Sequence, residues 1–214
     1  MTLKDIRIKV CGMRDAANIH AVARHQPDYL GFIEYPRSPR FVGADFVVPT
    51  GLSTDIVKTG VFVDERLPDM LQRARDAGYD AIQLHGAESP AFCADVRQAG
   101  LRVIKVFRVD SDFDFSATGP FVDVADVFLF DARGLHPGGN GIRFDWRVLT
   151  KYDQKVPFFL SGGLGPTSLA VDIGNLNGMN LYGVDLNSGV ESAPGMKDID
   201  KVEASIQTVR SMQE

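Results

Sequence analysis

Two side chains that can move protons follow short apolar runs, and they are Cys11 and Asp131. A thiol can act as a general base or nucleophile when nearby cations favour its thiolate, and Lys9 and Arg40 are candidate cations. A carboxylic acid can handle a second proton, so the two residues together suit an isomerisation. Taken alone, Cys11 could equally be a buried core cysteine, and Asp131 could cap the loop that follows it.

Glycine-containing turns follow two later apolar runs. One contains Gly162 and Gly163, and the other contains Ser188 and Gly189. Glycine lets backbone N–H groups approach an anion closely, and a short helical turn after Ser188 and Gly189 would add a helix N-terminus. Glycines at such places can also serve only to allow tight turns. Two turns of this kind in successive units favour a phosphate site.

Three further side chains have a chemical and a structural interpretation. Arg40 follows Ser38 and Pro39, and it is either a surface residue or a clamp for a planar carboxylate. His85 could bind a metal, but no second histidine stands at ligand spacing, so we expect no metal. Cys93 lies among apolar residues of a predicted helix, and we assign it to the core.

Eight short apolar runs recur through the chain, and each has the length of a β-strand. Strands this apolar are usually covered on both faces. Cys11, Asp131 and both glycine turns directly follow such runs, so the chemistry falls at strand ends. The predicted strands are 6–10, 29–33, 56–63, 81–84, 103–107, 127–130, 157–160 and 181–185.

Amphipathic stretches occupy most of the gaps between these strands. Residues 110–123 are a poor helix, so we expect the fifth helix to be short or irregular. The Gly-rich loop at 132–143 is expected to move over a ligand. The predicted helices are 15–24, 67–77, 88–99, 166–173 and 199–212.

Alternation of strand and helix predicts parallel pairing with right-handed crossovers, in an α/β fold. An open doubly wound sheet and a closed barrel both fit this rhythm. The count of eight strands, and the lack of a Gly-rich turn after the first, favour a (β/α)8 TIM barrel. We therefore expect residues 1–214 to form one barrel domain, with the active site at the C-terminal ends of the strands.

Composition excludes several classes of protein. The chain has 214 residues and a net charge of −5, so it lacks the basic excess expected of a nucleic-acid-binding protein. We find no secretion signal and no apolar stretch long enough to span a membrane. The two cysteines fit neither a disulfide framework nor a zinc site. A cytoplasmic protein with reduced thiols is the expectation.

A series of motifs along nearly the whole chain resembles the phosphoribosylanthranilate isomerase family of tryptophan biosynthesis. Each motif is modest evidence, but the set in this order is highly specific. The motifs are KVCGM at 9–13, GFI at 31–33, SPR at 38–40, GVFV at 60–63, QLHG at 83–86 with Glu88, Asp131 with GGNG at 138–141 and FDW at 144–146, LSGGL at 160–164, VDLNSGVE at 184–191 and GMKD at 195–198.

The resemblance implies the Amadori rearrangement of N-(5-phosphoribosyl)anthranilate to 1-(2-carboxyphenylamino)-1-deoxyribulose 5-phosphate, without a cofactor. It implies that Cys11 is the general base and Asp131 the general acid. Arg40, His85 and Asp185 are the expected substrate-binding residues, with Arg40 facing the anthranilate carboxylate and Asp185 near the sugar. The phosphate would lie at Gly162, Gly163, Ser188 and Gly189. We expect a monomer rather than a homodimer.

Two alternatives remain open at this point. Another phosphate-binding barrel enzyme is possible, but a metal-dependent epimerase needs a His/Asp ligand set that we do not find. An isomerase of the histidine pathway would carry Asp where this chain has Cys11. A phosphate-binding protein without activity should have lost the acid or the base, and both are present.

The chain departs from the family pattern at two positions. The family commonly has Thr in place of Asn140 and often Ala in place of Ser161.

Overall fold

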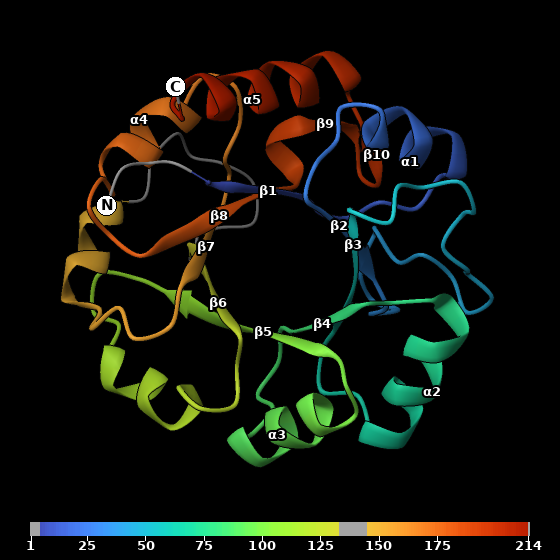
Figure 1. The fold of residues 1–214 in the computed structure, drawn as a ribbon, viewed down its shortest axis with the longest axis horizontal. Helices are drawn as coiled ribbons and strands as arrows, with labels where there is room; N and C mark the ends of the chain where they lie inside the picture. Colours follow the sequence, from blue (N-terminus) through green and yellow to red (C-terminus); the bar gives the residue numbers. More distant parts are fainter. Residues whose placement is uncertain (1–4, 133–144, 214) are drawn as a thin grey trace.

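The computed structural model describes residues 5–132 and 145–213 of the chain. Eight strands pair in parallel in chain order, and β8 also pairs with β1, which closes the sheet into a barrel (Figure 1). All eight predicted strands are confirmed, and their ends differ from the prediction by at most two residues. The strands are β1 Arg7–Val10, β2 Tyr29–Ile33, β3 Val57–Phe62, β4 Ala81–Leu84, β5 Arg102–Val109, β6 Val127–Ala132, β7 Phe158–Ser161 and β8 Leu181–Leu186.

Helices surround the barrel, and three of them begin with a side-chain cap (Figure 1). Asp15, Ser89 and Asp198 each accept a hydrogen bond from a backbone N–H of the first turn, which satisfies a donor that the helix leaves unpaired. The helices are α1 Ala16–Ala23, α2 Leu67–Ala77, α3 Pro90–Gln98, α4 Leu169–Gly174 and α5 Ile199–Ser211. The short elements are the 3₁₀ helices η1 Phe115–Phe121, η2 Trp146–Lys151 and η3 Ser188–Val190, with β9 Glu191–Ala193 and β10 Met196–Lys197.

The regular alternation of strand and helix is wrong at the connection from β2 to β3, which contains no helix. Three prolines interrupt this segment, at 36, 39 and 49, and proline removes the backbone donor that a helix needs. The apolar side chains of Val42, Phe46 and Val48 pack on the core there. The fifth helix is irregular, as predicted, since η1 is a 3₁₀ helix that contains Pro120.

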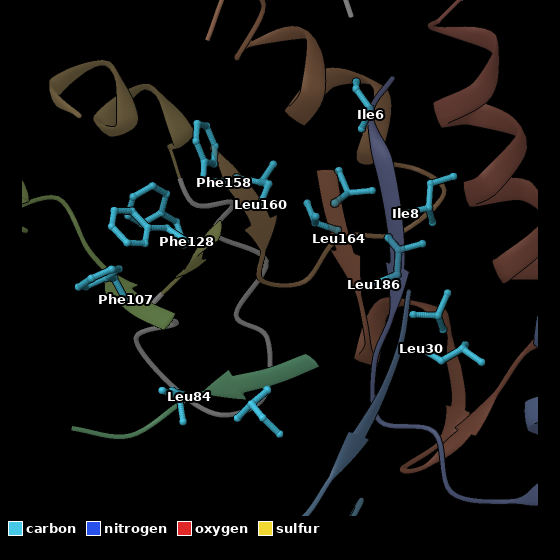
Figure 2. Packing of buried hydrophobic residues seen from close by; sticks show 14 of the residues in the cluster. Ile6, Ile8, Leu30, Leu84, Phe107, Phe128, Phe158, Leu160, Leu164 and Leu186 are labelled. Atoms are coloured by element: carbon cyan, nitrogen blue, oxygen red, sulfur yellow. The ribbon is translucent and has the colours of Figure 1, made fainter. Parts of the chain in front are cut away.

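Side chains of the strands alternate between two apolar layers. The outer layer lies between the barrel and the surrounding elements, and Figure 2 shows part of it, including Ile8, Leu84, Phe128 and Leu160. A separate inner cluster fills the barrel and consists of Tyr29, Ile104, Val106, Val127, Leu129 and Phe159. Period-two alternation therefore assigns each strand residue to the inside or the outside of the barrel.

Candidate active site

A row of polar residues crosses four strands of the barrel at one level. The strand register aligns Lys9 with Asp185, Asp185 with Ser161, and Ser161 with Asp131. Lys9 Nζ lies 2.9 Å from Asp185 Oδ1, and Ser161 Oγ donates to Asp185 Oδ2 at 3.4 Å. The Lys9 side chain is fully buried, so this ion pair would be costly to break.

Cys11 directly follows β1 and is buried beside this row. A Cβ on Gly31 would lie 2.7 Å from Cys11 Sγ and 3.1 Å from Lys9 Nζ, so the glycine gives both groups their room. Burial raises the pKa of Cys11, while the charges of Lys9 and Lys197 lower it and that of Asp185 raises it. The two expected cations, Lys9 and Arg40, both interact electrostatically with the thiol, and Lys197 is a third that the sequence did not indicate. Burial outweighs these charges, so the pKa of Cys11 is raised.

Asp131 and His85 face one another near the end of β6. The Asp131 side chain is 28% exposed, and His85 Nε2 lies 3.7 Å from its Oδ2. The Gln83 amide Nε2 lies 3.1 Å from His85 Nδ1. With the amide as donor, Nδ1 accepts and a neutral ring carries its proton on Nε2, toward Asp131. The structure thus brings together an accessible acid and a histidine.

The segment after β4, which carries His85, is fixed by a buried ion pair that sequence reasoning missed. Lys105 Nζ donates to Glu88 Oε2 at 2.8 Å and to the Gly86 carbonyl at 2.7 Å. Glu88 in turn accepts from the backbone N–H groups of Gly86 and Asp64. Lys105 interrupts an apolar strand in the sequence, and that interruption was the available signal for a buried charge.

Arg40 is paired with a partner that the sequence did not reveal. Its Nε lies 2.9 and 3.1 Å from the two carboxylate oxygens of Glu191, and its Nη2 lies 2.6 Å from Oε2. Burial alone would raise the pKa of Glu191, but hydrogen bonds from Arg40 and Lys197 lower it to about 2. Arg40 therefore has one edge committed to Glu191, while its Nη1 lies outside this pair.

The two glycine turns after β7 and β8 lie against one another. Gly162 and Gly163 have φ values of 119° and 65°, which L side chains rarely adopt. A Cβ on Gly163 would meet no atom within 4 Å, whereas one on Gly189 would collide with the backbone of Leu164. Ser188 is exposed and begins the 3₁₀ helix η3, whereas the sequence placed a short helical turn after Ser188 and Gly189. The corner is thus lined by glycines and open at Gly163.

Four further expectations concern the loop after β6, metal binding, membrane spans and Cys93. The loop predicted at 132–143, with Gly138, Gly139 and Gly141, lies outside the described residues apart from its first residue. Within residues 5–132 and 145–213, no group of three or more His, Cys, Asp or Glu side chains is arranged to hold a metal ion. No helix in the same part of the chain is long and apolar enough to cross a membrane. Cys93 is fully buried in the core, as predicted.

Fold and site together define a (β/α)8-barrel enzyme with a thiol, a carboxylate and two glycine-containing turns at the ends of its strands. The family model for N-(5'-phosphoribosyl)anthranilate isomerase matches residues 8–208. The chain belongs to this family, and it is an isomerase.

Individual relatives agree with the family model. The N-(5'-phosphoribosyl)anthranilate isomerase of Phocaeicola vulgatus is 42% identical over 191 residues, 89% of this chain and 91% of the relative. The solved isomerase of Thermotoga maritima has 28% identity and a TM-score of 0.86, covering 96% of this chain and 99% of the other; that organism's enzyme is also described as dimeric. A family structure with reduced 1-(o-carboxyphenylamino)-1-deoxyribulose 5-phosphate has a TM-score of 0.83 at 27% identity, covering 96% and 99%.

Proposed function

We propose that this isomerase converts N-(5-phosphoribosyl)anthranilate to 1-(2-carboxyphenylamino)-1-deoxyribulose 5-phosphate, with Cys11 as general base and Asp131 as general acid. The observation that carries the proposal is the polar row across β1, β8, β7 and β6. It begins at Lys9 beside the thiol, continues through Asp185 and Ser161, and ends at Asp131. The two proton-transfer groups therefore flank a common space at the barrel mouth.

The reaction needs one proton delivered and one removed. Asp131 protonates the ribose ring oxygen, and the C1–O bond breaks to give an open-chain iminium. That cation acidifies the C–H bond at C2, and the Cys11 thiolate takes this proton to give an enolamine. The enolamine then tautomerises to the ketone. Since the substrate supplies its own electron sink, the scheme requires no cofactor, and each positioned group contributes about 10²- to 10⁴-fold.

Substrate recognition divides between the two ends of the molecule. The turns at Gly162, Gly163, Ser188 and Gly189 bind the phosphate through backbone N–H groups, since both turns are open or exposed. Arg40 binds the aryl carboxylate through the donors that Glu191 leaves unused.

The space between these ends holds the sugar. Asp185 lies near it, with one oxygen held by Lys9 and the other by Ser161. His85 contacts it from the β4 side, opposite Asp131.

The remaining properties are also proposals. We expect a monomeric, cytoplasmic, single-domain enzyme of tryptophan biosynthesis that binds neither nucleic acid nor membranes. The net charge of −5 supports the lack of nucleic-acid binding. Light scattering over a concentration series tests the oligomeric state, and a mass of twice 23.4 kDa at all concentrations would replace the monomer by a dimer.

The decisive experiment follows the loss of anthranilate-type fluorescence when freshly made phosphoribosylanthranilate is mixed with the purified protein. Turnover with product of the expected mass supports the proposal. A folded protein that gives no rate above the uncatalysed background overturns it. A parallel titration with EDTA separates this reaction from a metal-dependent one, since the proposed chemistry is indifferent to chelation.

A further inference from the structure

A buried charge cluster joins the loop after β8 to Arg40. Besides its contacts with Arg40, Glu191 lies 2.8 Å from Lys197 Nζ. The Lys197 side chain is fully buried, and its Nζ also donates to Asn187 Oδ1 at 2.9 Å and to the Asn187 carbonyl at 3.2 Å. The three donors of this ammonium are thus matched by three acceptors, which fixes its position. One carboxylate therefore ties Arg40 to Asn187 through Lys197.

Lys197 itself is anchored at its backbone. Its N–H donates to Asn18 Oδ1 at 2.8 Å, and its carbonyl accepts from Asn18 Nδ2 at 2.9 Å. Asn18 belongs to α1 and is buried, so β10 is held against that helix. The cluster is consequently attached to α1 as well as to the loop after β8.

The same cluster packs on the residue that follows the proposed base. A Cβ on Gly12 would lie 2.7 Å from Asn187 Oδ1 and 2.8 Å from Arg40 Cδ. Gly12 also has φ of 77°, a conformation that favours glycine. Asn187 and Arg40 therefore converge over the Cys11–Gly12 backbone, one from the β8 side and the other from the β2 side.

We propose that Glu191 and Lys197 are positioning residues that hold the Arg40 guanidinium at a fixed place relative to the turn at 187–189. They set the spacing between the carboxylate-binding and phosphate-binding ends, so that the site selects a substrate whose two anionic groups lie at one separation. The cluster contains two cations and one anion, and the remaining positive charge suits an anionic ligand. The inference rests on the proposed function, which assigns the two ends.

A double-mutant cycle between Arg40 and Glu191 tests the first half of the proposal. Glu191→Gln should raise KM about tenfold and change kcat by less than about threefold, because Arg40 loses its orientation while acid and base stay in place. In an Arg40→Met background the same substitution should add less than about twofold to KM. Glu203→Gln, which removes an exposed carboxylate on α5, is the matched control. An undiminished effect of Glu191→Gln in the Arg40→Met background would overturn the inference.

Inorganic phosphate, measured by calorimetry, tests the second half without turnover. Lys197→Met should weaken phosphate binding about fivefold or more, since Asn187 loses its buried donor, and Lys197→Arg should recover part of the loss. Glu191→Gln should leave phosphate affinity within about twofold. Equal losses in both variants would mean general destabilisation and reject the proposal. If the wild type binds phosphate but gives no turnover, the proposed function fails, while these binding results still decide on Lys197.

Discussion

At Cys11, burial and neighbouring charge act in opposite directions on the thiol. Burial raises its pKa, the nearby Lys9 and Lys197 lower it, and Asp185 raises it again. The charge state of a buried thiol among two cations and one carboxylate depends on any further charge that forms beside it. The iminium of the proposed mechanism is such a charge, because its positive charge would favour the thiolate.

The proposed roles of the acid and base predict large losses of turnover without loss of binding. Cys11→Ala and Asp131→Asn should each lower kcat by about 10²- to 10⁴-fold, because each removes one proton transfer. Phosphate affinity should stay unchanged. Steady-state kinetics and calorimetry check both points. Cys93→Ala is the matched control, since it removes the other buried cysteine, which lies in α3 within the apolar core, and should leave kcat unaltered. Near-wild-type kcat in either site variant would refute the assigned role.

The charge around Cys11 also predicts the direction of a pH shift. If the thiolate is the base, kcat/KM rises as pH increases through the pKa of Cys11. Lys197→Met removes a cation that lowers this pKa, whereas Lys9, Asp185 and Arg40 remain. The rising limb should therefore move to higher pH, by up to about one unit.

A pH profile of kcat/KM for the wild type and for Lys197→Met measures this shift. Lys155→Met removes an exposed lysine that pairs with Asp153, and it should leave the limb in place. A limb that moves to lower pH in Lys197→Met would contradict a thiolate base.

How far the site could be predicted from sequence differs between residues. The sequence allows Cys11, Asp131 and the glycine turns to be proposed as site residues, because strand ends can be recognised in it and the barrel brings strand ends together. The partner of Arg40 could not be found in this way, since Glu191 is 151 positions away and only the closed barrel makes them neighbours. Lys9 was placed beside Cys11 correctly, but its pairing with Asp185 depends on contact between β1 and β8.

Among the elements, the strands were predictable and the connections were less so. Each strand is a short apolar run, which is the pattern of a parallel strand covered on both faces. The layer that covers the strands is more varied, because regular helices and irregular segments can both bury the outer face of the barrel. Between β5 and β6, Phe115 of η1 packs edge-on to Phe130 at 5.7 Å between ring centroids, so aromatic contact replaces a regular helix. Amphipathic periodicity does not predict such packing, because it detects only regular helices.

The turn after β7 predicts that inorganic phosphate competes with the substrate and that Gly163→Ala weakens this competition. A methyl group at residue 163 meets no atom within 4 Å, so it would project into the open corner. The backbone cost of a left-handed alanine is about 1 kcal/mol. We expect the inhibition constant of phosphate to rise at least about fivefold, since the methyl group hinders approach to the backbone donors.

Gly100→Ala is the matched control for this variant. Gly100 has φ of 86° and equally open surroundings, but it lies between α3 and the start of β5, whereas Gly163 follows the end of β7. It carries a similar conformational cost and should leave phosphate inhibition unchanged. Kinetics of the wild type that are insensitive to high phosphate would remove the phosphate assignment altogether.

At the scale of the whole molecule, closure of the barrel makes the site depend on both ends of the sequence. β1 pairs with β8 over four residues, and this pairing creates the contact between Lys9 and Asp185. The proposed base therefore follows the first strand, the proposed acid lies in the sixth, and the proposed phosphate-binding turns follow the seventh and eighth. No part of the chain carries the complete site, so partial unfolding anywhere in the ring should abolish activity.

Closure also predicts that the chain unfolds as one cooperative unit. Each strand has two paired neighbours, so opening the ring at one place exposes the inner apolar cluster around Phe159 and Leu129 along its length.

Trp146 is the single tryptophan, is buried and lies in η2, between β6 and β7. Its fluorescence therefore reports one sector of the ring, while far-UV circular dichroism reports all helices and strands. In urea, both signals should follow one transition with the same midpoint and slope. Activity should be lost over the same range of urea. Separate midpoints for the two probes would divide the barrel into independent units and reject the single-domain proposal for residues 1–214.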